Sequence, residues 1–139
     1  MKQLSSDELS SVAGGAGTCA IAGDSIAFGL GQQMKQCQTN AKVGIPSSQI
    51  IDRVPTGHFG MVIISAGSND PDNPRLADNL TTMRRRVGGG VTWIAPMNPR
   101  ARSVVNSVAQ ANGDRVVSFT PGPDGIHPHS YADLARSVQ

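Results

Sequence analysis

The chain has 139 residues, of which 38% are hydrophobic and only 4% aromatic, and its formal net charge is +2. This length fits one domain with its own core, and the small charge gives no electrostatic argument for binding nucleic acid or an anionic membrane. No apolar run is long enough to predict a membrane span, and the two cysteines and three histidines show no spacing typical of a metal site.

Residues 1–17 form a polar segment that differs from the rest of the chain. A Ser-x-x-Glu capping box followed by a Gly-Gly pair predicts a short helix. The segment also resembles the double-glycine leaders that peptidase-containing ABC exporters remove, with matches at Leu4, Ser5, Glu8, Leu9, Val12, Gly14 and Gly15. The resemblance implies that such an exporter is a partner, that residues 1–15 are removed and that the protein is secreted or extracytoplasmic. An ordinary capped helix on a cytoplasmic protein is the alternative, and both interpretations stay open.

Residues 18–139 alternate between strand and helix patterns, which predicts one domain. In chain order, the first five expected elements are a strand at 18–22, a helix at 26–36, a weak strand at 38–43, a helix at 46–54 and a strand at 61–65. A helix with an apolar stripe of Leu76, Leu80, Met83 and Val87 follows, and then a strand at 91–95. The last three elements are a helix with a stripe of Ala101, Val104, Val105 and Val108, a strand at 115–119, and a final helix carrying Tyr131, Leu134 and Val138. Five strands alternating with helices predict an α/β fold, a parallel sheet covered by helices on both faces.

The two cysteines, Cys19 and Cys37, precede or begin two predicted strands. Two buried thiols are the favoured interpretation. The alternative is a disulfide between the starts of neighbouring strands, which would require an oxidising compartment.

Other side chains are assigned structural positions. The run Arg84–Arg86 falls on a predicted helix, where successive side chains point about 100° apart. We therefore expect these arginines on solvated surface rather than in one basic patch. Trp93 lies in a strand expected to be buried, which predicts a core position.

Polar clusters follow four of the five predicted strands. They are Gly23-Asp24-Ser25, Gly44, Gly67-Ser68-Asn69-Asp70 and Asp124-Gly125-Ile126-His127. Because parallel strands end at one edge of a sheet, and sites form in the crevice there, we expect the four clusters to meet. Met97 and Asn98 follow the remaining strand and are expected to line a pocket at the same edge.

These residue types suit ester hydrolysis. Ser25 is the candidate nucleophile, His127 the base that takes its proton, and Asp124 the carboxylate that orients the imidazole. The backbone N–H groups of Ser25 and Gly44 and the side-chain amide of Asn69 are candidate donors to the oxyanion.

The neighbouring carboxylates are assigned structural roles instead. We expect Asp24 to bond nearby backbone groups and hold its turn, and Asp70 to be structural rather than catalytic.

The four clusters, in this order, resemble the sequence blocks of the SGNH (GDSL-like) hydrolases. The resemblance covers the chain from about residue 18 to its end and implies a flavodoxin-like sheet of order 2-1-3-4-5, no cofactor, and the family's roles for Ser25, Gly44, Asn69, Asp124 and His127. The chain differs in having Ile26 where leucine is usual, and in lacking long insertions after its strands. Its compactness suggests a shallow, open site.

The predicted function is that of a serine-dependent carboxylic ester hydrolase. The expected substrate is a small-molecule or glycan ester with a short acyl group, O-acetyl groups included. An acyltransferase and a non-catalytic secreted binding module on the same scaffold are the alternatives. A nucleotide-binding domain is disfavoured, because neither Gly-x-x-x-x-Gly-Lys-Ser/Thr nor Gly-x-Gly-x-x-Gly opens a helix.

Overall fold

The computed structural model describes residues 18–139, so the predicted leader-like segment 1–17 lies outside the described residues. Five parallel strands form one sheet in the order β2-β1-β3-β4-β5. The strands are β1 (Cys19–Gly23), β2 (Gln38–Ala41), β3 (Met61–Ser65), β4 (Val91–Ile94) and β5 (Arg115–Val117). The predicted strand order 2-1-3-4-5 is therefore confirmed.

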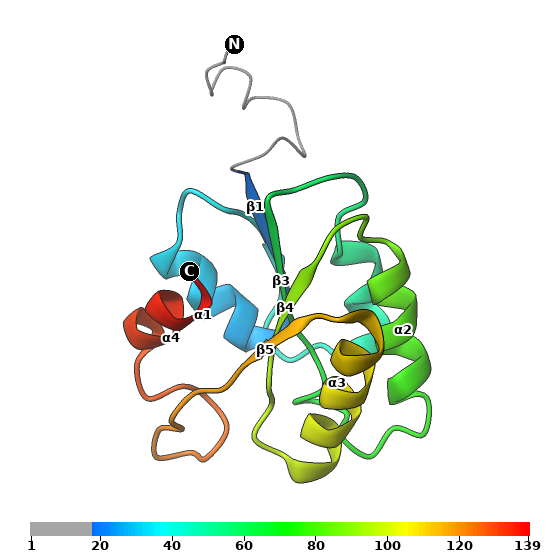
Figure 1. The fold of residues 1–139 in the computed structure, drawn as a ribbon. Helices are drawn as coiled ribbons and strands as arrows, with labels where there is room; N and C mark the ends of the chain where they lie inside the picture. The colour runs from blue at the N-terminus through cyan, green and yellow to red at the C-terminus, as the bar shows by residue number, and fades with distance from the viewer. Residues whose placement is uncertain (1–17) are drawn as a thin grey trace.

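Two pairs of helices cover the two faces of the sheet (Figure 1). One face carries α1 (Ser25–Gln33) and α4 (Tyr131–Val138), and the other carries α2 (Leu76–Arg85) and α3 (Pro99–Asn112). This is the expected three-layer αβα sandwich. No helix among residues 18–139 combines the length and the apolar character that crossing a bilayer requires.

The core lies in two layers because successive side chains of a strand point to opposite faces. On β3, Ile63 packs in the cluster beneath α1 and α4, whereas Val62 and Ile64 pack in the cluster beneath α2 and α3. Trp93 on β4 is fully buried in the second cluster, as predicted. This packing holds the strand ends, and the loops that follow them, in fixed relative positions.

The prediction of one helix over residues 46–54 is wrong. The chain forms two short 3-10 helices there, η1 (Ser47–Gln49) and η2 (Ile51–Arg53). Asp70, from the loop after β3, accepts hydrogen bonds from the backbone N–H and the hydroxyl of Ser47. At the other end, Pro55 favours an extended conformation for Val54, which has ψ of 123°. Because Ser47 is held at one end and Val54 is extended at the other, the segment forms two short 3-10 turns instead of one helix.

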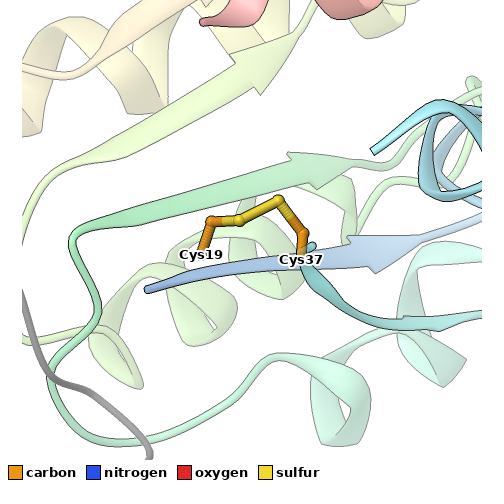
Figure 2. The surroundings of a disulfide bond; sticks show 2 residues. All are labelled: Cys19 and Cys37. Atoms are coloured by element: carbon orange, nitrogen blue, oxygen red, sulfur yellow. A yellow bond between two sulfur atoms is a disulfide. The ribbon is translucent and has the colours of Figure 1, made fainter. Parts of the chain in front are cut away.

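The favoured interpretation of Cys19 and Cys37 as free thiols is also wrong. They form a disulfide with a Cα–Cα distance of 4.8 Å. Figure 2 shows the bond joining the start of β1 to the residue just before β2. Because β1 and β2 are hydrogen-bonded neighbours, their starts lie close enough for the bridge.

A buried ion pair corrects the expectation of a solvated position for Arg84, whereas its neighbour Arg85 is exposed as expected. Arg84 Nε lies 2.6 Å from Asp114 Oδ2, and the Asp114 side chain is only 1% exposed. The same carboxylate accepts hydrogen bonds from Trp93 Nε1 and from the backbone N–H of Val91. Asp114 and Val91 precede or begin strands, so this cluster joins α2 to the amino ends of β4 and β5.

Candidate active site

Ser25 is the first residue of α1, directly after a tight turn that leaves β1. Gly23 has φ of +149°, and a Cβ there would lie 2.1 Å from the carbonyl oxygen of Ser65 on neighbouring β3. Only glycine therefore fits. Asp24 caps the helix by accepting the backbone N–H of Ile26 at 3.1 Å. The Ser25 N–H is left at the helix N-terminus, where backbone amides have no carbonyl one turn earlier.

The structure brings Ser25, His127 and Asp124 into one hydrogen-bonded series. Ser25 Oγ lies 2.8 Å from His127 Nε2, across 102 residues of sequence. His127 Nδ1 lies 2.6 Å from Asp124 Oδ2. Because the carboxylate accepts the hydrogen on Nδ1, Nε2 is free to accept the serine hydroxyl. This is the spatial arrangement expected from the sequence.

The loop between β5 and α4 holds His127 in this position. The second oxygen of Asp124 accepts the backbone N–H groups of Ile126 and His127, both at 2.9 Å. The Gly122 N–H donates to the carbonyl of His127 at 2.8 Å, and a bridge between Pro121 and Pro128 closes the loop. One carboxylate thus fixes both the loop and the imidazole ring.

Hydrogen bonding keeps Asp124 ionised. The bond from the His127 ring, followed by those from the backbone N–H groups of His127 and Ile126, lowers the pKa of Asp124 to about 2. The side chains of His127 and Asp124 are 40% and 52% exposed. The site is therefore open, as the lack of insertions suggested.

Asp24, next to the candidate nucleophile, is in the opposite situation. It is fully buried, and this desolvation raises its pKa to about 6, although hydrogen bonds from Ser65 and the backbone partly offset the rise. Its Oδ1 accepts the Ser65 hydroxyl at 2.9 Å, whereas Oδ2 has no hydrogen-bond partner among the described residues. These contacts agree with the expected role in holding the turn.

Tyr131 is a neighbour of the site. From the sequence it was expected only to lie on the final helix, with no role at the site. Burial, together with the charges of Asp24 and Asp124, raises the pKa of its hydroxyl. Its ring packs against α1 at Gly29, where a Cβ would lie 2.3 Å from Cζ. The Gly29–Tyr131 spacing gave no signal, because the two residues come from different helices.

The loops after β2 and β3 are joined at the same edge of the sheet. Asn69 Nδ2 donates to the carbonyl of Ile45 at 3.0 Å, one residue after Gly44. Asp70 bonds Ser47 rather than the Ser25–His127 pair, as expected for a structural residue. The Ser47 hydroxyl, which donates to Asp70 at 2.6 Å, is a supporting contact that the sequence analysis missed. The oxyanion roles of Gly44 and Asn69 remain predictions.

Met97 and Asn98 line a surface hollow together with Gly125 and Ile126 of the His127 loop. Met97 and Asn98 therefore reach a hollow beside the His127 loop, although neither Ser25 nor His127 lines it. Among residues 18–139, no group of three or more His, Cys, Asp or Glu side chains is placed to hold a metal ion.

The chain is similar in structure to a domain of known activity, although not in sequence. No protein-family model and no curated protein matches it. The C-terminal catalytic domain of Streptococcus pneumoniae peptidoglycan O-acetyltransferase A (OatA), solved with a methylsulfonyl adduct, superposes with a TM-score of 0.58. The two share 17% sequence identity over 89% of this chain and 93% of that domain. At this identity, the similarity establishes the fold alone.

Proposed function

We propose that this protein is a serine-dependent carboxylic ester hydrolase that acts on esters of short acyl groups. The observation that carries the proposal is the 2.8 Å contact between Ser25 Oγ and His127 Nε2, continued to Asp124. A serine hydroxyl is a poor nucleophile alone and becomes effective when an oriented imidazole takes its proton.

In the first half of the proposed reaction, Ser25 Oγ forms a bond to the acyl carbon while its proton passes to His127 Nε2. The imidazolium then gives this proton to the alcohol oxygen as the bond between acyl carbon and alcohol breaks. In the second half, water attacks the acyl-serine, His127 takes a proton from it, and the same proton returns to Ser25 Oγ as the acid leaves. Asp124, ionised at any pH above about 2, stabilises the imidazolium in both halves.

The proposed oxyanion donors come from three loops at the carboxyl edge of the sheet. They are the N–H of Ser25 at the start of α1, the N–H of Gly44 after β2, and Nδ2 of Asn69 after β3. The bond from Asn69 to Ile45 fixes the amide group and leaves its second hydrogen free for the substrate. Removing one such donor typically costs a factor of about 10²–10³ in kcat.

Two observations support a short acyl group. The site is open at His127 and Asp124, which are both about half-exposed, and the compact chain carries no long insertions after its strands to wall a channel for a long acyl chain. The similar domain is described as an O-acetyltransferase, which suggests an acetyl group.

The test compares wild-type protein with Ser25→Ala on p-nitrophenyl acetate. Ser107→Ala is the matched control, because it removes the hydroxyl of an exposed serine on α3, a helix that contributes no residue to the proposed triad. We expect Ser25→Ala to lose hydrolysis by a factor of at least about 10³, while Ser107→Ala retains it. Unchanged hydrolysis by purified Ser25→Ala would contradict the proposal.

Acyl transfer is the second candidate, and the O-acetyltransferase neighbour favours it. The two reactions share the acyl-serine and differ only in whether water or another hydroxyl attacks it. Product analysis with an acetyl donor and a glycan acceptor separates them. Acetylated glycan identifies a transferase, and free acetate alone identifies a hydrolase. Failure of both, with tight retention of a ligand, would identify a binding module instead.

An extracytoplasmic location is proposed from the disulfide between Cys19 and Cys37, because such bonds persist in oxidising compartments. Removal of residues 1–15 by an exporter remains part of this proposal. Mass spectrometry of protein from the producing cells tests it. Mature exported protein that begins at Ala16 would support a double-glycine leader, and exported protein that retains Met1 would contradict it.

A further inference from the structure

The exposed large apolar side chains of residues 18–139 all lie close in sequence to residues of the proposed site. They are Phe28, Val43 and Ile126, at 45%, 62% and 48% exposed. They come from the segments after β1, β2 and β5, and each lies within three residues of Ser25, Gly44 or His127. Single exposed apolar residues are ordinary on a protein surface. Of the three, Ile126 also lines a surface hollow together with other apolar residues.

Ile126 also borders a hollow with further apolar walls. The hollow measures about 370 Å³ and is lined by Ser68, Pro71, Met97, Asn98, Gly125 and Ile126. Pro71, Met97 and Ile126 reach it from the loops after β3, β4 and β5. A volume of this size falls in the range that small organic groups occupy in proteins.

The position of the hollow relative to His127 suggests which half of the ester enters it. His127 Nε2 must give its proton to the departing alcohol oxygen, so the alcohol lies beside the loop that carries His127. Ile126 is the residue directly before His127, and the hollow extends from it. The acyl half is bonded instead to Ser25 Oγ, just after the end of β1, whereas the hollow lies across the loops that follow β3, β4 and β5.

We propose that this hollow binds an apolar alkyl group on the alcohol half of the ester, with Ile126 and Met97 as specificity residues. The inference rests on the proposed function and deepens it by naming the class of alcohol. It favours the short-acyl ester of an apolar primary alcohol over the O-acetyl ester of a glycan, whose hydroxyl-rich alcohol would leave polar groups against these apolar walls.

Ethyl acetate and hexyl acetate provide a matched test, because they share the acetyl group and differ only in four methylenes of a primary alcohol. A fully buried methylene favours binding by a factor of about four, and a half-exposed one by about two. Hexyl acetate should therefore be hydrolysed with a kcat/KM roughly tenfold higher than ethyl acetate. Acetate release is measured for both, and for an O-acetylated methyl glucoside.

Three variants test whether the preference for hexyl acetate over ethyl acetate arises from the hollow. Ile126→Ser should reduce the ratio of hexyl to ethyl acetate to about two or three, since much of the apolar contact is removed. Met97→Ala, a second and independent change in the hollow, should also lower it. Val43→Ser removes a similarly exposed apolar side chain away from the hollow and should leave the ratio unchanged.

Two outcomes would overturn the inference while the proposed function stands. One is a wild-type ratio near one that Ile126→Ser does not change. The other is faster hydrolysis of the acetylated glucoside than of hexyl acetate. A third outcome, no hydrolysis of any ester and no labelling of Ser25, would contradict the proposed function and the inference with it.

Discussion

The buried carboxyl group of Asp24 makes a specific prediction about stability and pH. Oδ1 of Asp24 accepts hydrogen bonds from Ile26 and Ser65, but Oδ2 has no partner among the described residues and the side chain is fully buried. Burial disfavours the ionised form and raises the pKa from 3.8 to about 6. Asp24→Asn keeps an acceptor at Oδ1 and removes the ionisation.

The direction of the effect follows from the raised pKa. Well below the unfolded pKa of 3.8, Asp24 is protonated in both the folded and the unfolded chain, so its burial does not lower the free energy of unfolding. Between the two pKa values, only the unfolded chain ionises, so the free energy of unfolding falls. Above the folded pKa of about 6 the loss is complete. At about 1.4 kcal/mol per pH unit, the loss amounts to about 3 kcal/mol.

Urea unfolding of the wild type and Asp24→Asn, measured from pH 3 to pH 8, isolates this contribution. The stability of the wild type relative to the variant should fall by about 3 kcal/mol across this range. Ser65→Ala removes the hydroxyl that stabilises the ionised carboxylate, so the fall should start at the same pH, continue to a higher pH and become larger. Parallel pH profiles for the wild type and Asp24→Asn would show that Asp24 titrates alike in the folded and unfolded chains, contrary to this prediction.

Three further changes test other parts of the structure. Replacing both Cys19 and Cys37 by alanine should lower the free energy of urea unfolding by about 3 kcal/mol, because the bond closes an 18-residue loop; equal stability of the variant and the oxidised wild type would count against the disulfide. Asp114→Ala should lower the free energy of unfolding by about 3–5 kcal/mol, because it leaves the largely buried Arg84 without its carboxylate partner; a loss below about 1 kcal/mol would contradict a buried ion pair. Asp124→Asn should reduce kcat by up to about 10⁴ with little loss of stability, because His127 would lose its orienting carboxylate; a kcat close to that of the wild type would remove this carboxylate from the mechanism.

The sequence predicted the sheet well because its strands carry local signals. The apolar run at 61–65 became β3 with the same limits, and the four apolar residues from Leu76 to Val87 are all buried as one stripe. The proximity of Ser25, Asp124 and His127 could also be predicted, because parallel strands must end at the same edge. The rule that parallel strands end at one edge predicts which loops are close in space, although the sequence itself contains no distances.

The errors share a different cause, which is contact between segments far apart in the chain. Residues 46–54 have helical spacing, yet Ser47 is held by Asp70 from 23 residues away. Arg84 was expected in solvent, but in the folded chain it pairs with Asp114, which lies 30 residues later in the sequence. The disulfide partners depend in the same way on which strands are neighbours. No local pattern contains these pairings.

The central claim is that Ser25 is activated by His127, and a covalent label tests it most directly. The protein is incubated with methanesulfonyl fluoride, whose sulfur would bond to Ser25 Oγ as fluoride leaves, and the modified peptide is identified by mass spectrometry. We expect one methylsulfonyl group on Ser25, with labelling greatly slowed in a His127→Ala variant. Labelling that misses Ser25, or that proceeds equally fast without His127, would show that His127 does not activate Ser25.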